Sequence, residues 1–312
     1  MGSGMERLAI RRVLCPVQLT DFSGGLLAIG STLTRRYGAD LFTVHVLDDD
    51  VRRRKEEAVI RLRGLIRTKS GVDPRDVTSV VRRGNPVDEI AAYAERMEAD
   101  IIVAGRRLSS RIARVPATAG DRRQAAGPDM ARAARCAVLT VPTVGDDGPV
   151  PTAVAAAGVF KHIVCGVDFS RASLQALSHA IALAREAAGL LTVVHIVAGH
   201  ATGGSPKHHD RVIRRLDNLI GANARTRFRV RAIVRTGKPV DALLTVVRAE
   251  GGDLLVLGAT DSRGTGDRES CTATMASGRA DCPVLVVPEA MRNRSQAADW
   301  HPAPSHTIPV AR

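Results

Sequence analysis

The stretch IVCGVDFS at residues 163–170 runs from apolar residues into a short polar turn, and a similar stretch, VLCPVQLTDFS, occurs at residues 13–23. The apolar part has the composition of a buried β-strand. The polar residues that follow are typical of a turn before a helix, where a serine or threonine caps the first N–H groups. Two such stretches in one chain indicate an internal repeat.

Four further pairs of segments recur in the same order. Cys15 matches Cys165 and His45 matches His195, in both cases 150 residues apart. The offset becomes 153 in the middle of each copy and 146 near its end. The further pairs are LFTVHVL (41–47) with LLTVVHIV (190–197), RRGNPVDEI (82–90) with RTGKPVDAL (235–243), ADIIVAG (99–105) with GDLLVLG (252–258), and CAVLTVP (136–142) with CPVLVVP (282–288).

We infer a duplicated domain from these matches. The first copy spans residues 1–145, a Gly/Pro/Ala-rich linker spans 146–158, and the second copy spans 159–290. Residues 291–312 form a tail that we expect to be disordered.

Short apolar runs alternate with amphipathic helical stretches in each copy. In the second copy these runs are HIVCGV, LTVVHIV, FRVRAIV, DLLVLG and PVLVVP. Continuous apolar strands separated by helices predict a parallel sheet that is covered on both faces. Each copy is therefore predicted to be a five-stranded, doubly wound α/β domain, a fold in which ligands bind beyond the carboxyl ends of the strands.

The composition narrows the classes of partner. The net charge is +13, but aromatic residues make up only 3% of the chain, so we expect loose association with polyanions and no specific recognition of nucleic acid. No apolar run approaches the roughly 20 residues of a membrane span. The five cysteines form no C-x-x-C pair, which favours a cytoplasmic protein with buried thiols and no metal site.

Five motifs, taken in order, resemble the universal stress protein family. They are V-D-F-S after the first strand, His-Ile or His-Val in the second, G-K-P or G-N-P before the third helix, D-L-L-V-L-G in the fourth strand and C-P-V-L-V-V-P in the fifth. The resemblance covers almost the whole chain, twice. It implies two tandem flavodoxin-like domains, a cytoplasmic location and an intramolecular pseudo-dimer formed through the last strands, 137–142 and 283–288. Some members of the family bind ATP, and others do not.

The family's ATP-binding members carry an acidic residue after the first strand and a glycine-rich phosphate loop after the fourth. The resemblance places Asp168 at the acidic position, although the alternative is that Asp168 only caps the next helix. The loop departs from the pattern, because Asp261 replaces a glycine and Ser270-Cys271 replaces Gly-Ser. The predicted ATP-contacting residues, with Mg²⁺ accompanying the nucleotide, are Asp168, Ile196, Leu257, Gly258, Asp261, Gly264, Ser270, Cys271 and Thr272.

The first copy lacks these features. At the offset of 150, Gln18-Leu19-Thr20 faces Asp168-Phe169-Ser170, so Gln18 replaces the acid and Thr20 is predicted to cap the helix. The DFS triplet at 21–23 then matches its counterpart only by chance. The Arg-rich loop at 106–129 has no phosphate-binding glycines and is either solvated or contacts a partner or an anion. We expect no nucleotide site here.

Three functions remain open. The first is a non-catalytic, stress-associated regulatory protein that binds an adenine nucleotide in the second copy. The second is an interaction scaffold, with a protein partner, that has lost the ligand. The third is a slow ATPase, for which the sequence offers no water-activating group; no Ser-His-Asp or paired-carboxylate pattern stands out, so we expect no catalytic residues.

Overall fold

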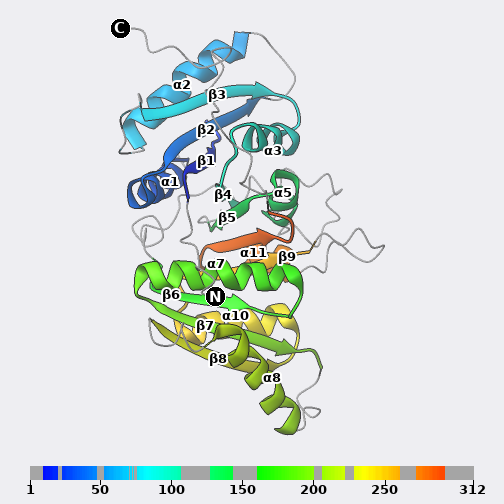
Figure 1. Cartoon of the computed structure of the whole chain (residues 1–312). Coiled ribbons are helices and arrows are strands. Elements are labelled where there is room, and N and C mark those ends of the chain that lie inside the picture. Colours follow the sequence, from blue (N-terminus) through cyan, green and yellow to red (C-terminus); the bar gives the residue numbers. More distant parts are fainter. Residues whose placement is uncertain are drawn as a thin grey trace. The chain divides into compact units, whose positions relative to one another are not determined.

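The computed structural model describes residues 10–19, 23–47, 53–69, 71, 73, 76–106, 127–142, 160–199, 206–221, 228–260 and 272–291 (Figure 1). The linker 146–158 and the tail from residue 292 lie outside the described residues. The chain divides into two compact units, which hold the described residues 10–142 of the first copy and 160–290 of the second.

The first copy alternates strands and helices around one sheet. Its strands follow the order β3-β2-β1-β4-β5, and all neighbours are parallel. The elements are β1 (Arg12–Pro16), α1 (Gly24–Tyr37), β2 (Asp40–Leu47), α2 (Arg53–Lys69), β3 (Val77–Arg83), α3 (Pro86–Arg96), β4 (Ile101–Gly105), α5 (Gly127–Ala134) and β5 (Ala137–Val141).

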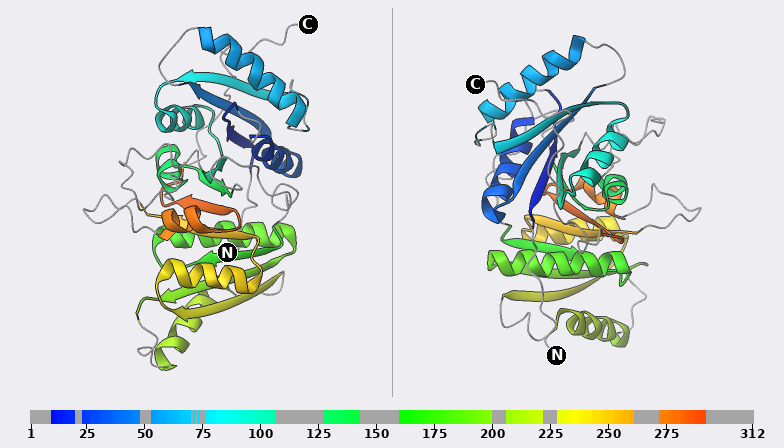
Figure 2. Two further views of the ribbon diagram at one scale, coloured as in Figure 1. Left: turned by 180° about the vertical axis from the view of Figure 1, so that it is seen from behind. Right: turned by 45° about the horizontal axis from the view of Figure 1, so that its top comes forward.

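The second copy repeats this topology, with parallel strands in the order β8-β7-β6-β9-β10. The elements are β6 (His162–Gly166), α7 (Arg171–Ala187), β7 (Leu190–Val197), α8 (Pro206–Ile220), β8 (Arg229–Thr236), α10 (Pro239–Glu250), β9 (Leu254–Ala259), α11 (Thr272–Arg279) and β10 (Val284–Pro288). Figures 1 and 2 show α7 and α10 on opposite faces of this sheet. The predicted fold class, two five-stranded parallel sheets with helices on both faces, is confirmed.

The register of the strands confirms the alignment of the two copies. Val13 pairs with Leu41 in β2, and Ile163 pairs with Leu191 in β7, so both strand pairs share the offset of 150. Val13 also pairs with Ile101, and Ile163 with Leu254, which gives the offset of 153 for the fourth strand.

The central strands are the core of each copy. The first strand of each unit is fully buried at Val13, Leu14 and Cys15, and at the three residues 163–165. Burial raises the pKa of the Cys15 thiol to about 12, and burial also raises that of Cys165. Both thiols therefore stay protonated and pack as small apolar side chains.

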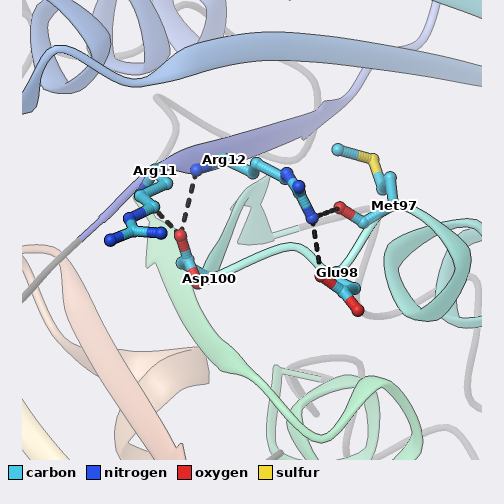
Figure 3. A network of polar contacts seen from close by, with 5 residues as sticks. All are labelled: Arg11, Arg12, Met97, Glu98 and Asp100. Atoms are coloured by element: carbon cyan, nitrogen blue, oxygen red, sulfur yellow. Dashed lines mark hydrogen bonds and ion pairs between the residues drawn. The ribbon is translucent and has the colours of Figure 1, made fainter. Parts of the chain in front are cut away.

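An aspartate before the fourth strand fixes the start of the first strand. In the first copy, Asp100 Oδ2 accepts hydrogen bonds from the backbone N–H of Arg11 (2.5 Å) and Arg12 (3.0 Å), and Figure 3 shows this contact. The Arg12 side chain also donates to Met97 O (3.0 Å) and to Glu98 Oε2 (2.8 Å). The strand start is thus held by a carboxylate and an arginine together.

The second copy repeats the carboxylate contact without the arginine. Asp253 accepts from the backbone N–H of Lys161 (2.8 Å) and His162 (3.0 Å). His162 stands in the place of Arg12, and its Nε2 contacts Thr192 Oγ1 at 2.9 Å. Because only the aspartate is shared, it is the part of the network that the fold itself requires.

We therefore expect Asp100→Ala and Asp253→Ala each to lower the free energy of unfolding by about 1–3 kcal/mol, because two backbone donors lose a charged acceptor. Urea unfolding followed by circular dichroism measures the change. Asp210→Ala, on the exposed surface of α8, is the control and should have an effect below about 0.5 kcal/mol. Equal shifts in all three variants would contradict the proposed role.

Candidate functional site

The candidate site lies at the carboxyl ends of β6, β7 and β9, and its position depends on how the chain leaves β6. The N–H of Val167 donates to Val194 O (2.8 Å), and His195 Nδ1 lies 2.7 Å from Val167 O. A carbonyl oxygen only accepts, so His195 carries its proton on Nδ1. The contact gives His195 a structural role.

The same contact occurs in the first copy. His45 Nδ1 lies 2.9 Å from Val17 O, and the N–H of Val17 donates to Val44 O (2.9 Å). The chain therefore leaves both sheets at equivalent residues. Gln18, which follows Val17, takes the place that Asp168 takes after Val167, as the offset of 150 predicts.

The hydrogen bonds to the Asp168 side chain fall on one of its two carboxylate oxygens, Oδ1. Oδ1 accepts from the Ser170 N–H (2.9 Å) and from Ser170 Oγ (2.6 Å). Ser170 Oγ in turn accepts from the N–H of Ser173 (3.2 Å) and caps helix α7. Oδ2 has no hydrogen-bond partner among the residues that the structure describes.

These contacts keep Asp168 ionised. Partial burial on its own raises the pKa of Asp168. The nearby hydroxyl groups of Ser170 and Ser173 and the backbone N–H groups of residues 168 and 170 outweigh this effect, so the pKa lies below its usual value. Near neutral pH the turn after β6 therefore presents a negative charge with one unused oxygen.

Phe169 is a part of the site that the sequence did not reveal. Its backbone adopts a left-handed conformation with φ of 66°, which costs a non-glycine residue about 1–2 kcal/mol. Its ring lies 4.8 Å from the ring of His195, and the guanidinium of Arg215 in α8 lies 3.8 Å from its centroid. These two contacts hold Phe169, and hence the neighbouring Asp168, in this strained turn.

The first copy uses the equivalent arginine differently. Arg61 and Arg215 each precede a fully buried leucine, Leu62 and Leu216, in the second helix of their copy. Arg61 donates to the backbone oxygen of Leu19 at 2.9 Å, whereas Arg215 covers the Phe169 ring. An arginine one residue before this leucine in both copies was the sequence signal for these contacts.

The prediction that Thr20 caps the first helix stays a prediction. Helix α1 begins at Gly24, with Ser23 in the capping position, so it starts three residues later than the offset of 150 requires. Ser23 Oγ donates to Gln18 O (2.5 Å), and its side chain caps no N–H group. The backbone of Ser23 is already helical, with φ of −67° and ψ of −12°. Thr20 and Asp21 themselves lie outside the described residues.

Gly258 joins β9 to the start of α7. A Cβ at this position would lie 2.3 Å from the backbone carbon of Ala172 and 2.5 Å from the N of Ser173. Ser173 Oγ also accepts from the N–H of Asp168 (3.3 Å), so the structure brings Gly258 and Asp168 together around the first turn of α7. Close packing is therefore a sufficient reason for a glycine at 258.

The remaining predicted residues fall into two groups. Ile196 is half-buried at the end of β7, Leu257 is buried in β9, and Thr272 is the half-buried first residue of α11. The other four lie outside the described residues: Asp261, Gly264, Ser270 and Cys271. Residues 107–126 of the Arg-rich loop also lie outside them.

Within the described ranges, no group of three or more histidine, cysteine, aspartate or glutamate side chains is arranged to hold a metal ion. None of the helices in these ranges is both long and apolar enough to cross a membrane.

The strand order within each copy defines the protein as a tandem of doubly wound α/β domains. A model of the universal stress protein family matches residues 9–142 and 160–288, and the chain belongs to that family. A comparison with curated protein sequences gives no significant match.

Solved structures agree with the fold over both copies. A universal stress protein from Archaeoglobus fulgidus has a TM-score of 0.65 and 18% identity, and the match covers 90% of this chain and 97% of that chain. A protein of unknown function from Pseudomonas aeruginosa has a TM-score of 0.55 and 17% identity, with 92% and 95% covered. At these identities the likeness concerns the fold alone.

Replacing Gly258 with alanine should destabilise the second copy by about 3 kcal/mol, because the new methyl group would overlap backbone atoms that cannot rotate away. Chemical unfolding measures the loss. Gly64→Ala is the control, since a Cβ there meets no atom within 4 Å and alanine favours the helix by about 0.5–1 kcal/mol. A tolerated Gly258→Ala would show that the contact with α7 is loose.

The lowered pKa of Asp168 predicts a dependence of stability on pH. A carboxylate whose pKa is lower in the folded state contributes stability above about pH 4, and this contribution is lost as the pH falls through the lowered pKa. Asp168→Asn keeps an acceptor for Ser170 but loses the charge. The wild type should therefore exceed Asp168→Asn in melting temperature at pH 7, and the difference should vanish near pH 2. A difference that does not change with pH would contradict this assignment.

Proposed function

We propose that this universal stress protein is a non-catalytic regulatory protein in which only the second copy binds an adenine nucleotide, ATP accompanied by Mg²⁺. The observation that carries the proposal is the ionised Asp168 with its unused Oδ2 at the carboxyl ends of β6, β7 and β9. Parallel α/β folds bind their ligands at this edge. The first copy has the neutral Gln18 at the equivalent place.

The residues around Asp168 suit an adenine nucleoside. Oδ2 is an acceptor for a ribose hydroxyl or an adenine amino group, and Oδ1 stays bound to Ser170. Ile196 and Leu257 supply apolar surface at the ends of the neighbouring strands. Thr272 begins helix α11, and a helix N-terminus favours a phosphate group. Mg²⁺ would neutralise charge on the phosphates near Asp261.

A nucleotide-independent scaffold is the second candidate. It is favoured by the contact between Asp168 and Ser170, because capping α7 is by itself a reason for an aspartate at this position. In that case a protein partner binds in the same way with and without ATP. A slow ATPase is the third candidate, and ATP turnover that disappears in Asp168→Asn would support it.

We further propose that the two copies pair through residues 137–142 and 283–288, because both segments are apolar last strands and pairing would remove two exposed edges. A cytoplasmic location is proposed from the cysteines, since the four described ones are buried and form no disulfide with one another: Cys15, Cys136, Cys165 and Cys282.

Titration calorimetry with ATP, in the presence and absence of Mg²⁺, tests the nucleotide proposal. We expect one nucleotide per chain and an affinity about ten-fold lower in Asp168→Asn, because a charged hydrogen bond to the ligand is lost. Asp168→Asn is preferred to alanine because it retains an acceptor for the cap of α7.

Gln18→Ala is the matched control, since it changes the equivalent position of the first copy and should leave the affinity unchanged. No heat at millimolar ATP would rule out nucleotide binding and favour the scaffold. An equal loss of affinity in Gln18→Ala and Asp168→Asn would show that the site does not depend on Asp168.

A further inference from the structure

Strand β8 is the outermost described strand of its sheet. Among the described strands it pairs only with β7, through residues 229–236 (Figure 1). Residues along a strand direct their N–H and C=O groups alternately to the two sides. Every second residue of β8 therefore directs its backbone groups away from β7, where another extended segment can pair with them.

Three arginines occupy one face of this edge strand. Side chains two residues apart lie on the same face, which groups Arg229, Arg231 and Arg235 with the half-buried Ile233. Arg231 forms an ion pair with Glu250 at the end of α10, so this is the face that α10 covers. All three arginines are exposed.

Among the described residues, two of these three arginines have no acidic side chain as an ion-pair partner. Arg231 is paired with Glu250 and also donates to Thr192 Oγ1 (3.0 Å). Arg235 donates to the backbone oxygen of Val234 (3.1 Å), and neither Arg229 nor Arg235 forms an ion pair with an acidic side chain in the described part of the chain. The edge thus carries two uncompensated positive charges, separated by about 20 Å of extended chain.

The first copy is an internal control for these charges. The register aligns Val77 with Val230, so β3 and the residue before it have Asp76, Thr78 and Arg82 at the positions of the three arginines. Arg82 lies 3.8 Å from Glu89 and covers the ring of Tyr93 at 5.6 Å. The same fold is therefore built without an unpaired arginine row, so the row in β8 is not a requirement of the fold.

The positive charge extends to the neighbouring strands. The pKa of His162 in β6 is lowered, first by burial and then by the charge of Arg231, with a further contribution from Arg229. Asp253 opposes this effect but does not reverse it. The arginines of β8 therefore act on a side chain two strands away.

The opposite face of β8 is apolar. Val230, Ala232 and Val234 are half-buried or buried on the side of α8. Side chains of paired strands that share a face contact one another. A segment that adds to β8 would therefore match it with acidic residues on the side of α10 and apolar residues on the side of α8.

We propose that β8 is a docking edge for an extended segment of a partner protein in which acidic and apolar residues alternate. The segment continues the sheet beyond β8 and places its carboxylates beside Arg229 and Arg235. Backbone pairing supplies affinity, and the arginines select acidic sequences. A nucleic acid offers the negative charge but has no backbone amides for this pairing, so the proposal concerns a protein segment.

The test uses a fluorescein-labelled peptide of about ten residues that alternates glutamate with valine, measured by fluorescence anisotropy with the full-length protein. We expect saturable binding that weakens with salt. The double variant Arg229→Gln/Arg235→Gln should bind about ten-fold more weakly, because two ion pairs of about 0.5–1 kcal/mol are lost. Arg231 is left unchanged because it holds Glu250 and Thr192.

Two controls separate this site from general attraction by a cationic protein. Arg82→Gln/Arg83→Gln removes the same charge from β3 of the first copy and should leave the peptide affinity unchanged. A peptide of equal charge with prolines at alternate positions cannot pair and should bind at least ten-fold more weakly. Hydrogen exchange should show new protection in β8 when the first peptide binds.

Several outcomes would overturn the proposal. These are an absence of peptide binding at millimolar concentration, an equal loss in both double variants, equal binding of the proline peptide, or unchanged exchange in β8. Tighter binding of a single-stranded oligonucleotide that depends on Arg229 and Arg235 would also overturn it in favour of a nucleic-acid site. Each readout is independent of ATP, so failure here leaves the nucleotide proposal unaffected.

Discussion

A hydrogen bond between the second strand and the end of the first determines the geometry of both copies. His195 Nδ1 contacts Val167 O, and His45 Nδ1 contacts Val17 O. This bond fixes the residue at which the chain leaves the sheet. The next residue is therefore placed at the ligand edge whatever its chemistry. In one copy that residue is Asp168, and in the other it is Gln18.

The duplication separates the requirements of the fold from those of function. Asp100 and Asp253 accept the same two backbone N–H groups, and the two histidines make the same contact, so these residues serve the architecture. Positions that the two copies fill differently cannot be required by the fold in that form. The acid after β6 and the two arginines Arg229 and Arg231 of β8 are of this second kind, whereas Arg235 has Arg82 as its counterpart.

The strands, their order and their register could be predicted from the sequence because apolar runs and shared spacings are local signals. The contacts of Phe169 with His195 and Arg215 could not. They join residues from three separate elements, and they depend on a left-handed backbone at a phenylalanine, which propensity argues against. The start of α1 at Gly24 could not be predicted for a related reason. The alignment fixes which residues are equivalent, but a helix begins only where its first N–H groups find acceptors.

Asp168 connects the folding of the second copy to its capacity to bind. Its Oδ1 fixes Ser170, Ser170 caps α7, and the first turn of α7 packs on Gly258. The same carboxylate is therefore already oriented when a ligand arrives, and little side-chain entropy is lost on binding. In the first copy the absence of this carboxylate accompanies a helix that begins almost one turn later. The glutamine at position 18 thus removes the charged acceptor from the ligand edge of the first copy.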